Sequence, residues 1–223
     1  MARVEPARRP AAAIFDLDGT LADTFALVFA SWNEAMREPT GRQYSPEEIM
    51  ARFGVPDPDM IRRELPHDQH ERAVEVYHDF YAARHEQMVN TFDGVREMLD
   101  ELSKRRVPMG IVTGKGLRTM NITLHTLGLD RHFGVTISGD DVERQKPAPD
   151  ALVLAARALG VEPNQCAMIG DSPADISAGK AAGMLTVAAA WHAPYRERIR
   201  ALEPDVWAET PRDVVRVFDD ERT

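Results

Sequence analysis

The chain has 223 residues, of which 43% are apolar and 28% are charged, a balance typical of a folded globular protein and unlike that of a disordered or collagen-like chain. Lys and Arg number 27 against 36 Asp and Glu, which gives a net charge of -9, so we expect neither a nucleic acid nor an anionic membrane surface as a partner. The single cysteine, Cys166, excludes an intramolecular disulfide and fits a reducing compartment.

The first ten residues are basic, and the apolar stretch that starts at residue 11 is interrupted by Asp16, Asp18 and Asp23. A signal peptide or a membrane span needs an uninterrupted apolar segment, so neither is predicted here. We therefore expect a cytoplasmic protein.

Five short apolar runs alternate with helix-like segments along the chain. The runs cover residues 11–15, 109–112, 134–137, 166–169 and 185–190. The helix-like segments cover roughly residues 94–106, 116–127, 148–159 and 173–182, and glycine follows three of them, as is common where a helix ends. Continuous apolar runs of this length are typical of strands buried on both faces. The sequence therefore predicts an α/β fold: a doubly wound parallel sheet with a Rossmann-like core.

The long connection between the first two runs is different. Residues 22–90 contain no strand-like run, although a crossover between parallel strands needs only about a dozen residues. Helical patterns cover roughly 22–38, 46–53, 58–64 and 68–88, with breaks at 39–41 and 54–58. We predict an inserted α-helical cap domain over residues 22–90 and a core domain made of residues 1–21 and 91–223. The cap has seven arginines against thirteen acidic residues, and no lysine.

Polar side chains follow four of the runs. Asp16 and Asp18 follow the first, Thr113 and Gly114 the second, Lys146 the third after a loop, and Asp171 and Asp175 the fourth. In an open parallel sheet, ligands bind beyond the carboxyl ends of the strands, so these residues are predicted to meet at one edge. The structural alternative is that Asp16 and Asp171 cap helices and that Lys146 is a surface charge.

This set of residue types indicates phosphoryl chemistry. Clustered carboxylates repel one another unless a divalent cation neutralises them, and hard oxygen ligands suit Mg²⁺. Asp16 and Asp18 can both face the cleft only if the backbone turns, which Gly19 permits. One carboxylate can attack phosphorus and form an acyl phosphate, while a second protonates the leaving group and later activates water. Thr113 and the amides beside it would hold phosphoryl oxygens, and Lys146 would balance their charge.

The four segments resemble, in order, the four motifs of the haloacid dehalogenase-like phosphohydrolase superfamily, and the insertion resembles its helical type 1 cap. The pattern is most similar to that of phosphoglycolate phosphatase-like and pyrophosphatase-like members. The resemblance implies that Asp16 is the nucleophile, Asp18 the general acid and base, and Thr113, Gly114 and Lys146 the phosphate-binding residues. It also implies that Asp16, the carbonyl of Asp18, and Asp171 bind Mg²⁺. Asp175 would either support these ligands from behind or bind the Mg²⁺ through a water molecule.

The resemblance implies a Mg²⁺-dependent phosphatase that hydrolyses a small phosphorylated metabolite, phosphoglycolate or a related phosphomonoester, through an aspartyl phosphate. The alternatives are a pyrophosphatase, a β-phosphoglucomutase-type isomerase and a binding protein without catalytic activity. Dehalogenases of the superfamily lack a counterpart of Asp18, and phosphonoacetaldehyde hydrolases need a lysine in the cap. The mutases have a histidine twelve residues after the nucleophile, where this chain has Val28.

The loop 52–56 between two predicted cap helices is the candidate for substrate recognition. Arg52 could pair with a carboxylate or a second phosphate, and Gly54 could let the backbone approach a ligand; equally, Arg52 could be a solvated helix end. Lys115 could reach a phosphate or be a surface charge. We expect Cys166 and the cap histidines to be packing residues. Neither the substrate nor the oligomeric state follows from the sequence.

Overall fold

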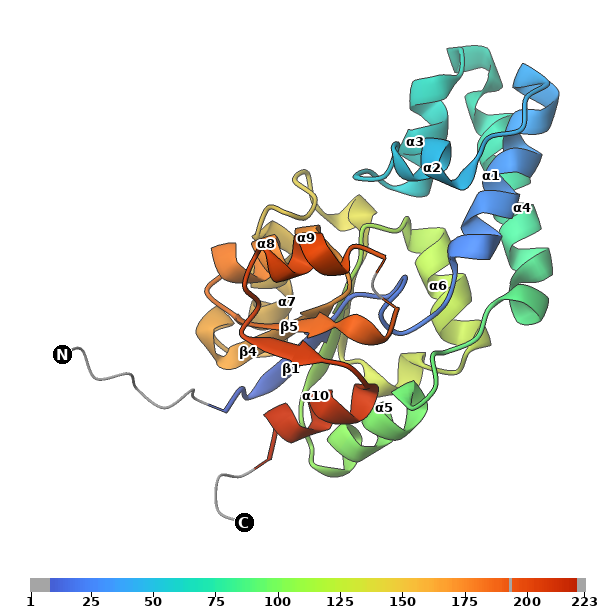
Figure 1. Ribbon diagram of the computed structural model, residues 1–223. Coiled ribbons are helices and arrows are strands. Elements are labelled where there is room, and N and C mark those ends of the chain that lie inside the picture. Colours follow the sequence, from blue (N-terminus) through green and yellow to red (C-terminus); the bar gives the residue numbers. More distant parts are fainter. Residues whose placement is uncertain (1–8, 193, 220–223) are drawn as a thin grey trace.

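A six-stranded parallel sheet forms the centre of the molecule (Figure 1). The computed structural model describes residues 9–192 and 194–219. The strands are β1 (Ala12–Phe15), β2 (Met109–Val112), β3 (Val135–Ile137), β4 (Cys166–Gly170), β5 (Leu185–Ala189) and β6 (Val206–Ala208). They lie in the order β3-β2-β1-β4-β5-β6, and all neighbours pair in parallel. The chain thus moves outward from β1 in both directions, as in a doubly wound sheet, and the predicted fold class is confirmed.

Helices cover both faces of the sheet, and the strand sequences show why. Successive side chains of a strand point to opposite faces. In β1, Ala13 and Phe15 pack in one core cluster with α5 (Val95–Lys104), α6 (Leu117–Thr126) and α10 (Pro211–Val217). Ala12 and Ile14 pack in a second cluster with α7 (Asp150–Ala158), and α8 (Pro173–Ala181) lies on that same side (Figure 1). β1, β2 and β4 are buried at every position, and for that reason their sequences are apolar throughout.

Five α-helices lie between β1 and β2, and the first four of them form what we call the helical insertion: α1 (Phe25–Thr40), α2 (Pro46–Met50), α3 (Asp57–Glu64) and α4 (His70–Met88). They agree with the helical patterns predicted there, except that α1 continues through Pro39 and ends before Gly41. The insertion stands beside the sheet and covers neither of its faces (Figure 1). Its buried apolar side chains, which include Trp32, Met36, Tyr77 and Ile61, belong to the same core cluster as Phe15 of β1.

Two short connections join the insertion to the sheet, and they pair with each other. Ala22 forms an antiparallel bridge with Thr91, and Asp23 donates its backbone N–H to the carbonyl of Asn90 at 3.0 Å. This paired crossing lies where the sequence predicts the limits of the cap. The division into two domains itself stays a prediction.

The C-terminal part contains elements that the apolar runs do not predict. The sheet has a sixth strand, β6, followed by α10 and preceded by α9 (Arg196–Arg200). β6 lies at the sheet edge, where only Ala208 is fully buried, and its apolar run has just three residues. Asp205 fixes it instead, since Oδ2 of Asp205 accepts hydrogen bonds from N and Oγ1 of Thr186 at 2.8 and 2.6 Å.

Short 3₁₀ turns complete the secondary structure, at His67–Gln69, Asp130–His132, Gly139–Asp141, Pro163–Gln165 and Ala190–His192. Within the described ranges, no helix combines the length and the apolar character needed to cross a membrane.

Candidate active site

A cavity of about 180 Å³ lies between the carboxyl ends of the strands and the helical insertion. Its lining includes the predicted site residues Asp16, Asp18, Gly54, Thr113, Gly114, Lys146 and Asp171. Asp175 lies directly behind this lining, against Lys146. Of all the predicted site residues, only Arg52 lies away from the cavity.

Lys146 is the centre of the polar network below the cavity. Its Nζ lies 3.0 Å from Oδ1 of Asp16 and donates to Oδ1 of Asp175 at 2.7 Å and to the carbonyl of Val112 at 3.0 Å. Burial alone would lower the pKa of this lysine, but Asp16 and Asp175 raise it above its ordinary value. Lys146 is therefore a permanent buried cation that joins three strand ends, and the structural alternative of a surface charge is wrong.

Asp16 follows β1 directly and is buried, with 8% of its surface exposed. Burial, together with the charges of Asp175 and Asp18, raises the pKa of its carboxyl to about 7 although Lys146 acts in the opposite direction. No described residue donates a hydrogen bond to Oδ2 of Asp16. One oxygen is thus held by Lys146, and the other is available to a ligand in the cavity.

Asp16, Asp171 and Asp175 form a buried cluster in which one ligand atom of each lies within 4.8 Å of the others. Burial, and next to it the charge of Asp16, raises the pKa of Asp171 well above its ordinary value. Both oxygens of Asp175 are occupied, because Lys146 donates to Oδ1 while N and Oγ of Ser172 donate to Oδ2 at 2.9 and 2.6 Å.

The cluster fits a hard divalent cation. Oδ1 of Asp171 accepts a hydrogen bond from Oγ1 of Thr20 at 2.9 Å, which leaves Oδ2 of Asp171 and Oδ2 of Asp16 as open oxygens. A bound cation would relieve the repulsion between these two carboxylates. Gly19 leaves room for this arrangement: its φ is +83°, and a Cβ there would lie 2.3 Å from Oδ2 of Asp171.

The Asp18 carboxylate lies outside the cluster. Thr24 donates from Oγ1 to its Oδ1, and Lys115 donates from Nζ to its Oδ2 at 3.3 Å. The side chain of Asp18 is therefore held by the connection before α1 and by the loop after β2. The predicted metal ligand on this residue is its backbone carbonyl, and that assignment stays a prediction.

Lys115 is not a surface charge. Its side chain is 1% exposed, and its Nζ lies 4.7 Å from the centre of the Tyr81 ring, which belongs to α4 of the insertion. Burial alone would lower the pKa of Lys115, but Asp18 holds it well above its ordinary value. The sequence left open whether Lys115 reaches a phosphate or is a surface charge. The surface charge is wrong, and Lys115 is instead a partner of Asp18.

Thr113 and Gly114 form the loop between β2 and Lys115. The N–H of Thr113 continues the sheet by donating to the carbonyl of Ile137 at 3.0 Å, and its Oγ1 accepts a hydrogen bond from N of Lys115 at 3.2 Å. Gly114 faces open space, since a Cβ there would meet nothing within 4 Å. The loop thus presents a hydroxyl and an uncovered backbone to the cavity.

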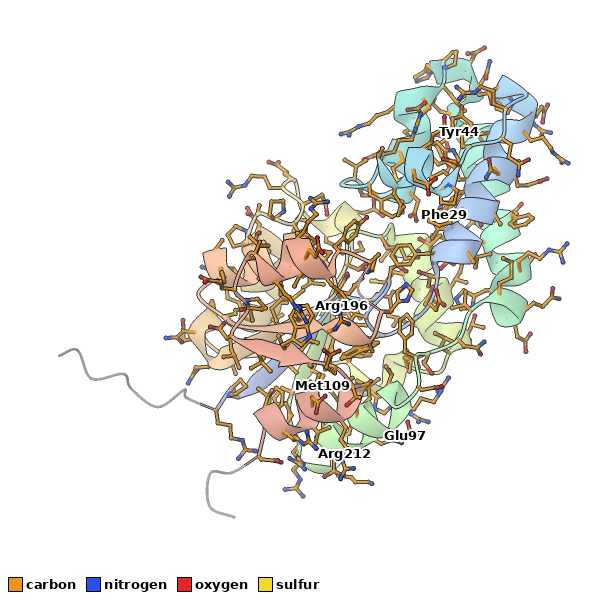
Figure 2. All side chains as sticks on the ribbon, viewed as in Figure 1. Phe29, Tyr44, Glu97, Met109, Arg196 and Arg212 are labelled. Atoms are coloured by element: carbon orange, nitrogen blue, oxygen red, sulfur yellow. The ribbon has the colours of Figure 1, made fainter. Side chains whose placement is uncertain are left out.

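Arg52 points into the insertion instead. Its Nε lies 2.8 Å from Oε1 of Glu64, Nη1 donates to the carbonyl of Glu48, and its guanidinium lies 5.2 Å from the centre of the Tyr44 ring. Tyr44 is labelled at the end of the insertion far from the sheet (Figure 2). The structure therefore does not bring Arg52 to the cavity, whereas Gly54 of the same loop lines it.

Several residues of the site are missing from the sequence analysis. Asp57 lines the cavity, is buried, and accepts hydrogen bonds from Oγ1 of Thr119 and N of Gly116, so α3 contacts the start of α6. Met60 lines the same side, together with Phe53 and Val55 of the predicted recognition loop 52–56. Nothing in the local sequence marks Asp57 or Met60. Thr20 is different, since it follows Asp18 at the spacing Asp-x-Asp-x-Thr and the motif itself could have indicated it.

His78, His85 and Cys166 occupy the positions expected of packing residues, whereas His67 is exposed and His70 is half-buried. His78 and His85 are buried on α4, and Nε2 of His85 lies 3.1 Å from Oγ1 of Thr123. Burial lowers the pKa of His85 to about 4, so it is neutral at pH 7. Cys166 is buried in β4. The carboxylate cluster contains no histidine.

Known proteins resemble this chain over nearly its whole length. The family model of the haloacid dehalogenase-like hydrolases matches residues 13–189. The chain is 32% identical over 210 residues to pyrophosphatase PpaX of Bacillus velezensis, which covers 94% of this chain and 97% of the relative. It is 33% identical over 205 residues to PpaX of Anoxybacillus flavithermus, with 92% and 95% covered.

Solved structures agree on the fold. A protein of Haemophilus somnus, called a phosphoglycolate phosphatase by prediction, is similar with a TM-score of 0.85 at 22% identity, over 96% of this chain and 100% of that one. A hydrolase of Pseudomonas syringae is similar with a TM-score of 0.76 at 27% identity, over 92% and 96%. At the lower identity, the likeness shows the fold alone.

The family match spans β1 to β5, and thus every strand end that carries a predicted catalytic residue. The prediction of a phosphatase-type hydrolase is confirmed at that level. The chain belongs to the haloacid dehalogenase-like hydrolase family.

Proposed function

We propose that the protein is a Mg²⁺-dependent phosphatase that hydrolyses a small phosphorylated metabolite through a phosphoenzyme on Asp16. The observation that carries the proposal is the state of Asp16: a buried strand-end carboxylate with Oδ1 on Lys146 and Oδ2 open, in a cavity that also holds Asp171. The helical insertion would act as the cap of this site.

Asp16 and Asp171 would hold the Mg²⁺, with the backbone carbonyl of Asp18 as the further ligand that the resemblance implies. When bound, the cation neutralises the two carboxylates and draws charge from the phosphoryl oxygens. Asp175 supports this arrangement because it fixes Lys146 and Ser172 at 2.7 and 2.6 Å.

The proposed reaction has two displacements. Oδ2 of Asp16 attacks phosphorus, the bond from phosphorus to the leaving oxygen breaks, and Asp18 gives that oxygen a proton. Water then attacks the phosphorus of the acyl phosphate and gives its proton to Asp18, so that inorganic phosphate leaves and Asp16 is regenerated. Thr113, the backbone at Gly114, and Lys146 would hold the other phosphoryl oxygens while charge develops on them.

The cavity favours a small substrate. Its volume of about 180 Å³ is below the roughly 300–1,000 Å³ of sites that take drug-sized ligands. Phosphoglycolate-like monoesters fit this limit. Pyrophosphate is the second candidate, and the observation in its favour is the identity of 32–33% to relatives named pyrophosphatase PpaX. A mutase is disfavoured, because Val28, which lines the cavity, has no group that moves a proton.

Hydrolysis of p-nitrophenyl phosphate tests the proposal. We expect turnover with Mg²⁺ and none in excess EDTA, and we expect Asp16→Asn to abolish turnover because an amide cannot form the phosphoenzyme. Asp18→Asn should still form some phosphoenzyme in a single-turnover burst, since p-nitrophenolate leaves with little proton assistance. Asp23→Asn, which changes an exposed carboxylate nearby, is the matched control and should keep full activity.

Steady-state turnover by Asp16→Asn, or full activity in EDTA, would contradict the proposed mechanism. Phosphate binding without turnover in the unaltered protein would instead indicate a binding protein on this fold.

A further inference from the structure

The side of the cavity formed by the helical insertion is apolar. Phe25 and Val28 of α1, Phe53 and Val55 of the loop before α3, and Met60 of α3 line it. This apolar wall, as we call these five residues, faces the carboxylates and lysines at the strand ends. A substrate whose phosphoryl group lies at Asp16 therefore places its leaving group against hydrocarbon.

Aromatic stacking fixes the wall. The rings of Phe25 and Phe53 lie 6.3 Å apart and are inclined by 18°, and Phe25 also stacks on His192 of the core at 5.9 Å and 28°. His192 stacks in turn on Phe92 at 5.0 Å. The wall is thus continuous with the core through a row of rings, and its position relative to the strand ends is defined.

The wall contains no cation that could receive an anionic leaving group. None of the seven arginines of the insertion lines the cavity, and Arg52, the nearest along the chain, is paired with Glu64. The single charged residue that the insertion contributes to the lining is a carboxylate, Asp57.

The two cations in the lining, Lys115 and Lys146, already have partners. Lys146 bridges Asp16 and Asp175. Lys115 donates to Asp18 at 3.3 Å and its side chain is 1% exposed, so little of its surface is open to a distal anion. A carboxylate or a second phosphate at the wall would lose its water without gaining an unpaired cation as a partner, and it would face Asp57.

We infer that the substrate class is phosphate monoesters of neutral, partly apolar alcohols, and that the apolar wall with Phe53 selects against leaving groups that carry an anion. This inference rests on the proposed function, since it concerns the leaving group of that reaction. It narrows the proposed function, because phosphoglycolate and pyrophosphate, the candidates that the cavity volume and the named relatives favour, are then predicted to be poor substrates.

A matched pair of esters tests the inference on the unaltered protein. Phenyl phosphate and 3-carboxyphenyl phosphate release phenols of similar acidity and differ mainly by one carboxylate. With Mg²⁺ present, we expect kcat/KM to be at least tenfold higher for phenyl phosphate, with phosphoglycolate and pyrophosphate also below it. Equal or higher kcat/KM for any of the three anionic compounds overturns the inference.

A charge placed in the wall gives the converse test. Phe53 is 39% exposed, so Phe53→Arg can be accommodated, and it should raise the ratio of kcat/KM for 3-carboxyphenyl phosphate over phenyl phosphate by about tenfold. Phe53→Gln removes the ring without adding charge and should change this ratio less than threefold. Met88→Arg adds the same charge at the end of α4, outside the lining and 36% exposed, and should leave the ratio unchanged.

The outcomes separate the two levels of the argument. If no ester is hydrolysed with Mg²⁺, the proposed phosphatase function fails, and the inference fails with it. If the esters are hydrolysed and the anionic ones are preferred, or if Met88→Arg shifts the ratio as much as Phe53→Arg, the phosphatase stands and the inference about the leaving group is wrong.

Discussion

The two sides of the cavity differ in how they are built. At the strand ends, each charged side chain has a defined partner close by: Lys146 with Asp16 and Asp175, and Lys115 with Asp18. The helical insertion keeps its charges elsewhere, in pairs such as Arg52 with Glu64 and Arg72 with Glu38, and presents mainly apolar side chains to the cavity.

The difference shows how work is divided between the two sides. Buried carboxylates with raised pKa values are costly to keep together, and such a cost is typical of sites where a cation and a phosphoryl group bind. The apolar wall carries no such cost and performs no chemistry. In the proposed function it would accept or reject a leaving group by shape and polarity, so the strand ends would define the reaction and the insertion the range of substrates.

Gly19→Ala should produce the largest effect among the changes that test this division. A Cβ would lie 2.3 Å from Oδ2 of Asp171, in a backbone with φ of +83°, so the carboxylate that we propose as a Mg²⁺ ligand must move. We expect kcat/KM to fall by about a hundredfold or more and the Mg²⁺ requirement to rise, as measured by titrating Mg²⁺ against p-nitrophenyl phosphate turnover.

Gly41→Ala is the control for backbone strain alone. Gly41 also has a positive φ, +63°, but a Cβ there meets nothing within 4 Å. It should cost about 1–2 kcal/mol of stability and leave kcat/KM unchanged. If Gly19→Ala behaved in the same way, the close approach of Gly19 to Asp171 would have no catalytic importance.

Lys115→Met tests whether the partner of Asp18 matters for the chemistry. Without the lysine, Asp18 keeps only Thr24 as a partner, and we expect kcat to fall by about ten- to a hundredfold. The loss should be greater for an alkyl phosphate, which needs a proton on its leaving oxygen, than for p-nitrophenyl phosphate. Lys104→Met, at a side chain that is 75% exposed, should have no effect. Equal losses on both esters would contradict a role through Asp18.

The pH dependence of stability should report on Asp16. In the folded protein its pKa is raised to about 7 from an ordinary 3.8, so between these values the folded state binds more protons than the unfolded state. Without metal, the free energy of unfolding should therefore fall as pH rises from about 4 to 7, by roughly 1–3 kcal/mol from this group. Urea unfolding in EDTA at pH 5 and pH 7.5 measures it.

Asp16→Asn should remove the contribution of Asp16 to this decrease in the free energy of unfolding. Saturating Mg²⁺ should make the decrease smaller, because the cation stabilises the ionised carboxylate. If the free energy of unfolding changed by the same amount between pH 5 and pH 7.5 in Asp16→Asn and in the unaltered protein, the raised pKa of Asp16 would be contradicted.

Arg52→Ala should produce the smallest effect and tests the insertion side. Its guanidinium pairs with Glu64 and lies over the Tyr44 ring, so we expect a loss of up to about 1 kcal/mol of stability. We expect kcat/KM to stay within about twofold for neutral and anionic esters alike. A loss confined to anionic esters would restore the substrate contact that the sequence suggested and the structure does not show.

The sequence by itself determined the sheet and its polar edge. Apolar runs at every position of β1, β2 and β4 predict strands buried on both faces, and the carboxyl ends of parallel strands always meet at one edge. For that reason, the convergence of Asp16, Thr113, Lys146 and Asp171 required no knowledge of packing. β6 was not predicted because its apolar run has only three residues, which is too short to indicate a strand.

Only the tertiary structure decided the rest of the site. The direction of Arg52 depends on Glu64 and Tyr44, and the burial of Lys115 depends on Tyr81 from α4. The apolar wall depends on how the insertion meets the strand ends. Such contacts join side chains that are distant along the chain, and no local pattern specifies them, because a helix can bury or expose the same residue according to what packs against it.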